Sequence, residues 1–221
     1  MSHLVDRLVA GGRAVTAAGL VRGSGGNLSA RAPGENSFWV TATGTWLDRL
    51  TPADLSRVDL GTGRVLAGNP RPTSELPLHR ACYAVRPEVN AVIHLHPQLS
   101  VLLDALGEPI SLVTVDHAYY VREVRRTPFR HSGTPELVQG CADAVRDGCN
   151  CVVLAHHGCS VLADDLDLAL KRALNLEEAA AATYRALLLG RPVPQCPPEY
   201  LDRVRAAERP AAAQGVAAAA R

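Results

Sequence analysis

The sequence predicts an α/β fold of the α+β layered kind, with a central, mainly antiparallel sheet covered by helices. Short apolar runs of strand composition recur along the chain, separated by amphipathic stretches typical of helices. The two kinds of segment intermix without a strict β-α-β repeat, and no internal repeat is visible. A length of 221 residues, 47% of them hydrophobic, is enough for one domain with a full core.

The N-terminal half is expected to contain one helix, several strands and a glycine-rich loop. Apolar residues at helical spacing predict a helix over 4–18. The loop Gly23-Ser-Gly-Gly-Asn27 follows this helix and enters a strand, the reverse of the order in a dinucleotide-binding motif. Strands are expected over 27–30 and 37–41, then a hairpin of 58–60 and 64–66.

The C-terminal half is expected to carry most of the helices. Helices are predicted over 75–85, 98–105, 135–146 (with Thr134 as N-cap), 164–189 and 199–208, and strands over 91–97, 112–115, 151–158 and 160–163. Residues 191–198 are rich in proline, a composition that predicts a linker. We therefore expect a catalytic domain over 1–207 and a disordered, alanine-rich tail over 208–221.

Composition excludes several classes of function. The net charge is +1 and no basic stripe is interleaved with aromatic residues, so nothing indicates nucleic-acid binding. No apolar run approaches the ~20 residues of a membrane span, and no signal-like segment precedes Asp6 and Arg7, so a cytoplasmic location is expected. In that compartment the 6 cysteines are expected to be reduced core residues.

Two histidines share one face of an apolar segment, Ala91-Val-Ile-His-Leu-His-Pro97. In a strand, the side chains of His94 and His96 point the same way, with Cα atoms roughly 6–7 Å apart, so both imidazoles can reach one divalent ion. Burying two unpaired rings would cost about 1–3 kcal/mol each, and a metal bond removes that cost. The alternative is a solvated strand face.

Two further segments supply candidate ligands. Cys151-Val-Val-Leu-Ala-His-His-Gly158 is an apolar strand that ends in paired histidines. Neighbours on an extended chain point to opposite faces, so only one of His156 and His157 is expected to bind. Glu75 lies at a loop-to-helix junction, where a glutamate is also favoured by the helix dipole. Three imidazoles and a carboxylate suit Zn²⁺, or another divalent transition metal such as Mn²⁺ or Co²⁺.

Lysine usage bears on the mechanism. Lys171 is the single lysine of the chain, and it lies next to Arg172 on a long alanine-rich helix. A Schiff-base enzyme needs a lysine that is desolvated in a pocket. If carbanion chemistry takes place here, a metal is therefore the expected electron sink.

Five short motifs occur in one order along the chain: Gly26-Asn-Leu-Ser29, Thr43-Gly44, Thr73-Ser-Glu75, His94-Leu-His96 and His156-His-Gly158. Together they resemble the class II aldolase/adducin family, in particular its L-fuculose-1-phosphate aldolase branch, from about residue 4 to residue 189. The resemblance implies zinc held by His94, His96, His157 and Glu75, with Glu75 leaving the metal to act as general base. It also implies that the substrate phosphate is bound by Asn27, Thr43, Gly44, Thr73 and Ser74.

The reaction implied by the resemblance is a retro-aldol cleavage. A ketose 1-phosphate, such as L-fuculose 1-phosphate or a 5-deoxypentulose 1-phosphate, would yield dihydroxyacetone phosphate and an aldehyde through a metal-stabilised enediolate. The family also forms homotetramers with active sites at subunit interfaces, so a homotetramer is implied here. Within the family, a sugar-phosphate 4-epimerase and a phosphorylated sugar-acid decarboxylase are alternatives. A non-catalytic adducin-like module is a more distant one.

The proton donor to the aldehyde departs from the family pattern. Thr114 stands where the aldolase has a tyrosine supplied by a neighbouring subunit. Tyr119 is the first candidate in its place, followed by Tyr120 and His117, and the alternative is a pair of aromatic core residues on a strand end. Tyr200 is a possible counterpart of the family's C-terminal tyrosine.

Overall fold

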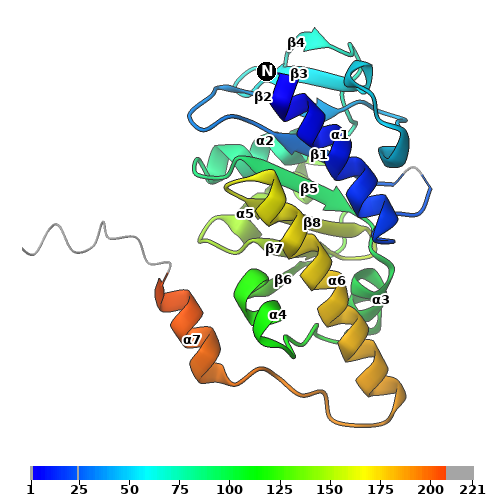
Figure 1. The fold of residues 1–221 in the computed structure, drawn as a ribbon, viewed down its shortest axis with the longest axis vertical. Helices are drawn as coiled ribbons and strands as arrows, with labels where there is room; N and C mark the ends of the chain where they lie inside the picture. The colour runs from blue at the N-terminus through cyan, green and yellow to red at the C-terminus, as the bar shows by residue number, and fades with distance from the viewer. Residues whose placement is uncertain (1, 24, 208–221) are drawn as a thin grey trace, which may run out of the picture.

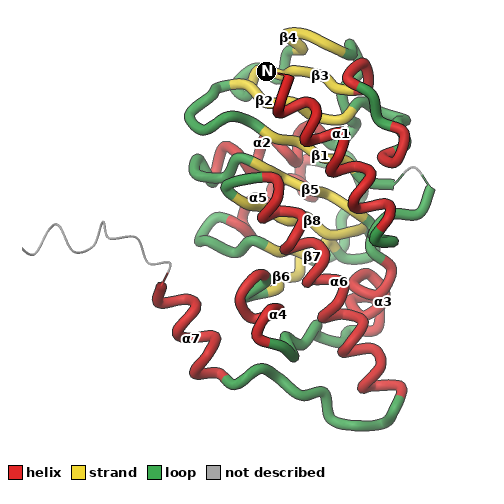
Figure 2. The backbone as a smooth tube through the Cα atoms, in the orientation of Figure 1, coloured by secondary structure: helices red, strands yellow, loops and turns green. Residues whose placement is uncertain are grey.

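The computed structural model describes residues 2–23 and 25–207 and contains one eight-stranded sheet with helices on both faces (Figures 1 and 2). The strands are β1 (Asn27–Ala30), β2 (Ser37–Thr41), β3 (Leu55–Asp59), β4 (Val65–Gly68), β5 (Ala91–Leu95), β6 (Val124–Thr127), β7 (Cys151–Leu154) and β8 (Gly158–Ala163). Their order across the sheet is β4-β3-β2-β1-β5-β8-β7-β6. Every neighbouring pair is antiparallel except β6 and β7, so the mainly antiparallel layered fold is confirmed.

The helices divide between the two faces of the sheet (Figure 1). The α-helices are α1 (Ser2–Ala17), α2 (Leu76–Val85), α3 (Gln98–Leu106), α4 (Val115–Tyr120), α5 (Pro135–Val145), α6 (Leu166–Leu188) and α7 (Pro198–Ala207), with 3-10 turns η1 (Leu47–Arg49) and η2 (Pro52–Asp54). The pair α1 and α6 packs on one face, and α2 and α5 pack on the other. The N-caps formed by Thr134 and Asp165 agree with the predicted starts of α5 and α6.

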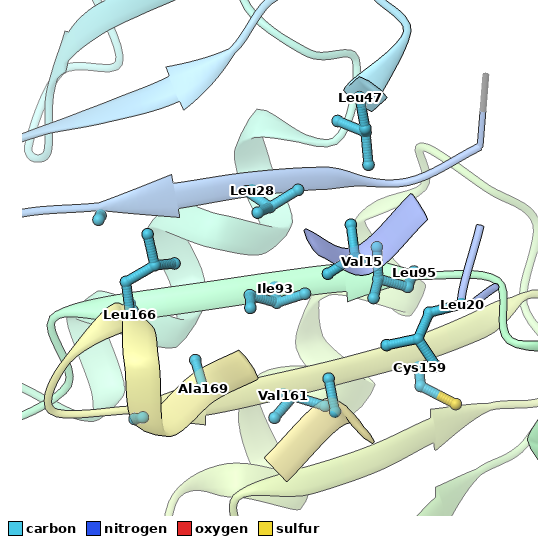
Figure 3. Close-up of a cluster of buried hydrophobic side chains, with 14 of the residues drawn as sticks. Val15, Leu20, Leu28, Leu47, Ile93, Leu95, Cys159, Val161, Leu166 and Ala169 are labelled. Atoms are coloured by element: carbon cyan, nitrogen blue, oxygen red, sulfur yellow. The ribbon is translucent and has the colours of Figure 1, made fainter. Parts of the chain in front are cut away.

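Side chains along β5 alternate between the two faces of the sheet, so this strand contributes to both hydrophobic clusters of the core. Ile93 and Leu95 point toward α1 and α6, where they pack with Leu28 and Val161 (Figure 3). Val92 points the other way, into the cluster beneath α2 and α5. Because side chains alternate along a strand, His94 shares the face of Val92. The core packing therefore places His94 under α2.

The segment around residue 112 differs from the prediction, which made 112–115 a strand. It forms no strand, because Leu112 uses its carbonyl to accept from the backbone N–H of Cys196, and Ser111 donates its hydroxyl to the carbonyl of Pro194. Thr114 then caps α4, which the sequence analysis did not predict. The short strand β6 was also missed.

The remaining expectations concern the cysteines, the membrane and the tail. All six cysteines are buried and free, as expected of core residues. Among the described residues, no helix combines the length and the apolar character that a membrane span requires. The tail predicted over 208–221 lies outside the described residues.

Candidate metal centre and active site

His94 and His96 meet at the end of β5. His94 is fully buried on the strand, and His96 follows its last residue. Their ring centroids lie 5.1 Å apart, and their Nε2 atoms are separated by 3.1 Å. The spacing of two residues thus brings both imidazoles to one point, as the period of a strand requires.

His157 reaches the same point from the turn between β7 and β8. Its ring centroid lies 4.9 Å from that of His94 and 5.1 Å from that of His96. An extended chain would bring one histidine of the pair to the site. The structure instead has a turn: His156 adopts φ 56°, and the N–H of His157 donates to the carbonyl of Leu154. His156 is exposed and packs its ring near Phe129.

Glu75 is the fourth member of the cluster. It is the N-cap residue of α2, and its carboxylate is 10% exposed. One oxygen, Oε2, lies 3.2 Å from Nε2 of His94, and the other, Oε1, lies 3.1 Å from Nε2 of His157. The carboxylate therefore bridges two imidazoles that come from separate parts of the chain.

The donor set fits a divalent metal ion. The ligand atoms of Glu75, His94, His96 and His157 all lie within 4.8 Å of one another. Bonds of about 2.0–2.1 Å in tetrahedral geometry place neighbouring ligand atoms roughly 3.3 Å apart, close to the separations of 3.1 and 3.2 Å found here. Nitrogen and carboxylate ligands in this number suit zinc and its transition-metal neighbours.

The protonation states of the histidines and of Glu75 also favour metal binding. Burial lowers the pKa of His94 to about 3, so its ring is neutral near pH 7 and keeps a lone pair for a metal. Burial also lowers the pKa of His96. For Glu75, burial by itself favours the protonated acid, but the hydrogen bond from His157 and the nearby His94 outweigh it, so its pKa lies below the usual range.

A neighbouring strand orients the ring of His94. Ser160 lies directly opposite His94 on β8, and its Oγ is 3.1 Å from Nδ1 of His94. A neutral ring that donates its Nδ1–H to this hydroxyl presents an unprotonated Nε2 to the cluster. Partners of this kind fix the tautomer of metal-binding histidines.

Gly158 is required by the close approach of His96 and the backbone of Leu95. A Cβ at this position would lie 2.5 Å from Cδ2 of His96 and 2.5 Å from the carbonyl oxygen of Leu95. Gly140 in α5 is a matched control, because a Cβ there would meet nothing closer than 3.9 Å.

We expect Gly158→Ala to displace the ring of His96 and to weaken metal binding about 10- to 100-fold, the usual effect of disturbing the support of a ligand. Overpacking should also lower the free energy of unfolding by about 1–3 kcal/mol. Gly140→Ala should instead be neutral or add up to about 1 kcal/mol through helix propensity. Metal titration and denaturant unfolding of both variants check this, and a Gly158→Ala protein with wild-type metal affinity would contradict it.

The expected phosphate-binding residues lie on two adjacent loops. The N–H of Thr43 donates to the carbonyl of Arg71, and the N–H of Thr73 donates to the carbonyl of Thr41. This pairing places Thr43 and Gly44 beside the loop that carries Thr73 and Ser74. Thr43, Gly44 and Ser74 are exposed, whereas Thr73 is buried and its Oγ1 accepts from the N–H of Glu75. Small polar groups thus line an open loop pair that adjoins the cluster.

Asn27, the fifth of these residues, is buried in β1 opposite His94. Its Nδ2 donates to Oε2 of Glu75 at 2.7 Å, and its Oδ1 lies 2.5 Å from Nε2 of His79. Sequence reasoning missed His79, although its spacing of four residues from Glu75 puts both on one side of α2.

The candidate proton donors lie on the other side of the sheet. Tyr119 and Tyr120 belong to α4, which packs against α6 and α7, and Tyr200 lies in α7. The Tyr119 side chain is 48% exposed, with its ring 5.0 Å from that of Tyr120. His117 is buried, and its Nδ1 accepts from the backbone at the start of α4. The predicted strand end is therefore a helix.

Comparison with known proteins agrees with this arrangement. The model of the Class II Aldolase and Adducin N-terminal domain matches residues 6–184. The chain is 34% identical over 199 residues to a 5-methylthioribulose-1-phosphate/5-deoxyribulose-1-phosphate aldolase from Rhodospirillum rubrum, an alignment that covers 89% of this chain and 87% of that protein. It is 32% identical over 164 residues to an L-fuculose phosphate aldolase from Methanococcus maripaludis, covering 74% and 87%.

Comparison with a solved structure agrees with the two sequence comparisons. An L-fuculose 1-phosphate aldolase superimposes with a TM-score of 0.84 at 28% identity, covering 92% of this chain and 95% of the other. The family model spans most of the sequence, and these two relatives and this solved structure are aldolases by name. This chain therefore belongs to the class II aldolase and adducin family, as an enzyme of the aldolase, or lyase, type.

Proposed function

We propose that this enzyme cleaves a ketose 1-phosphate, such as L-fuculose 1-phosphate or a 5-deoxypentulose 1-phosphate, to dihydroxyacetone phosphate and an aldehyde. The observation that carries the proposal is a cluster of three Nε2 atoms and one carboxylate, whose ligand atoms all lie within 4.8 Å of one another. Two relatives whose names specify sugar 1-phosphates or fuculose phosphate support this substrate class.

His94, His96 and His157 would hold the metal, with Glu75 as a fourth ligand at rest. We propose zinc, with manganese and cobalt as substitutes. When bound, the ion supplies Lewis-acid stabilisation of the negative charge that develops on substrate oxygen as the C3–C4 bond breaks. Away from His157 and His94, whose contacts lower its pKa, the buried Glu75 carboxylate would be a stronger base and could move a proton to and from the carbon of the ketone fragment.

The loops that carry Thr43, Gly44, Thr73 and Ser74 would bind the substrate phosphate, together with the side-chain N–H of Asn27 that is not donated to Glu75. Hydroxyl and backbone N–H donors suit a phosphate group. Thr73 links this loop pair to Glu75 through a hydrogen bond of 3.2 Å. Binding the phosphate would therefore fix the substrate relative to the proposed base.

The proton donor would come from a second copy of the chain. Tyr119 and Tyr120 lie on α4, which packs on α6, whereas Glu75 begins α2 on the opposite face of the sheet. An exposed tyrosine on α4 is available to the active site of a neighbouring subunit. We accordingly propose a cytoplasmic homotetramer whose active sites lie at subunit interfaces.

The direct test is product formation. Purified zinc-loaded protein is incubated with L-fuculose 1-phosphate and with 5-deoxyribulose 1-phosphate, and dihydroxyacetone phosphate is followed with a coupled reductase. We expect its release with at least one substrate and no release after chelation of the metal. NMR of the products separates cleavage from epimerisation at C4 and from loss of carbon dioxide. Absence of dihydroxyacetone phosphate with both substrates would contradict the proposal.

Tyr119→Phe removes one hydroxyl from an exposed ring. We expect it to lower kcat for cleavage by about 10²-fold, the lower range for losing a general acid. Tyr120→Phe is the comparison, because the two rings adjoin and lose the same group. Steady-state kinetics of both variants check the assignment. A loss confined to Tyr120→Phe would move the role to that residue, and two variants with wild-type kcat would reject both.

Mixed oligomers test the shared site. If Tyr119 serves a neighbouring subunit, co-expression of Tyr119→Phe with a His157→Asn chain should produce intact sites in about a quarter of the positions of a symmetric ring. Recovery of activity to that level, well above that of either variant alone, is the expected result. A co-expressed preparation as inactive as either parent would contradict an interface site.

A further inference from the structure

A chain of buried hydrogen bonds leads away from the candidate metal centre. Behind Asn27, the Nδ1 of His79 lies 2.6 Å from Oγ of Ser29, and that Oγ lies 2.8 Å from the hydroxyl of Tyr83. Together with the contacts of Asn27 to His79 and to Glu75, this forms one path from Tyr83 to the carboxylate of Glu75. Ser29 and His79 are fully buried, and Tyr83 is 1% exposed.

The periods of one strand and one helix align these residues. Asn27 and Ser29 are two apart on β1, so they point to the same face of the sheet. Glu75, His79 and Tyr83 are each four apart, so they form a stripe along one side of α2. The stripe along α2 therefore lies over Asn27 and Ser29 of β1. The path is therefore built into two regular elements.

The chemistry of the groups gives the path one direction. An ionised Glu75 only accepts, so Asn27 must present its NH₂ to it and its Oδ1 to His79. Nε2 of His79 must then carry the hydrogen. Burial lowers the pKa of His79 to about 4, which leaves its ring neutral and its Nδ1 free to accept from Ser29. Ser29 in turn accepts from Tyr83.

We propose that His79 is a positioning residue, which holds the amide of Asn27 so that both of its N–H groups face the active site. One N–H holds the carboxylate of Glu75, and the other is left for a phosphate oxygen of the substrate. This inference rests on the proposed function. Without the hydrogen bond from His79, the Asn27 amide is free to turn its Oδ1 toward Glu75, and two oxygen acceptors facing each other would displace the carboxylate.

A matched pair of substitutions separates this role from packing. The side chains of His79→Gln and His79→Met have equal length and similar volume, but the first keeps an N–H near the position of Nε2 and the second has none. We expect His79→Met to lower kcat about 10- to 100-fold, the range for losing the partner of a site residue. His79→Gln should stay within about threefold of the wild type.

Cobalt-loaded protein supplies a readout besides activity. The visible absorption of bound Co²⁺ reports its coordination geometry, so a displaced Glu75 changes the spectrum. We expect an altered spectrum in His79→Met and a wild-type spectrum in His79→Gln. Equal losses of kcat in both variants would show that His79 acts through packing and overturn the proposal. A His79→Met protein with wild-type kcat and spectrum would overturn it as well.

A third measurement needs neither metal nor a stable variant. Nitrogen-15 NMR of histidine-labelled wild-type protein reads the tautomer of His79, and we expect hydrogen on Nε2. Hydrogen on Nδ1 alone would reverse the path and overturn the proposal. Failure of the proposed function has a different signature: wild-type protein would bind no cobalt and release no dihydroxyacetone phosphate, with the His79 tautomer unchanged.

Discussion

Replacing His157 with asparagine is expected to abolish tight metal binding, whereas the same change at His156 is expected to leave it intact. The Nε2 of His157 lies 3.1 Å from Glu75, and an asparagine side chain is too short to reach that point. We expect the loss in affinity to exceed about 100-fold, the upper range for losing only a partner of a ligand. Activity should fall with metal content.

The comparison with His156 makes this test specific. His156 is exposed and has a φ of 56°, a conformation that asparagine adopts readily. His156→Asn should therefore fold normally and keep the metal. Metal titration by calorimetry, with metal analysis after dialysis, compares the two variants. The account fails here if His156→Asn loses the metal and His157→Asn retains it.

Glu75→Gln is expected to separate metal binding from catalysis. The amide keeps the shape of the carboxylate, and its oxygen still accepts from Asn27, but it carries no charge and takes up no proton. With three imidazoles left, the metal should remain bound with reduced affinity. We expect kcat to fall by about 10²- to 10⁴-fold, the usual contribution of a general base.

Single-turnover kinetics on metal-saturated protein measure this effect without interference from metal loss. Binding of inorganic phosphate, followed by calorimetry, should be unchanged in Glu75→Gln. The substitution alters neither of the two loops that carry Thr43 and Ser74. A kcat within about threefold of the wild type would mean that another group moves the proton and would remove Glu75 from this role.

Local periodicity predicted the parts of the candidate site that depend on local geometry. The strand period brings His94 and His96 together, and the helix start places Glu75 at the N-cap of α2. Each of these two placements depends on only a few consecutive residues. The caps at Thr134 and Asp165 were predictable for the same reason, since a short polar side chain satisfies the first free N–H groups of a helix.

Features that depend on distant segments could not be predicted in this way. The sequence pattern predicts an extended chain at His156 and His157, but a tight turn selects between them. Residues 112–115 have strand composition, yet the carbonyl of Leu112 accepts from the N–H of Cys196, and the next two N–H groups donate to His117. The role of His79 depends on the pairing of β1 with β5, which places Asn27 opposite His94. No period within a single element contains that information.

Anomalous diffraction from zinc-loaded crystals, measured at the zinc absorption edge, tests the central claim most directly. The account predicts one peak about 2.0–2.1 Å from Nε2 of each of His94, His96 and His157. A peak elsewhere, with these three rings free of metal in an active enzyme, would contradict it.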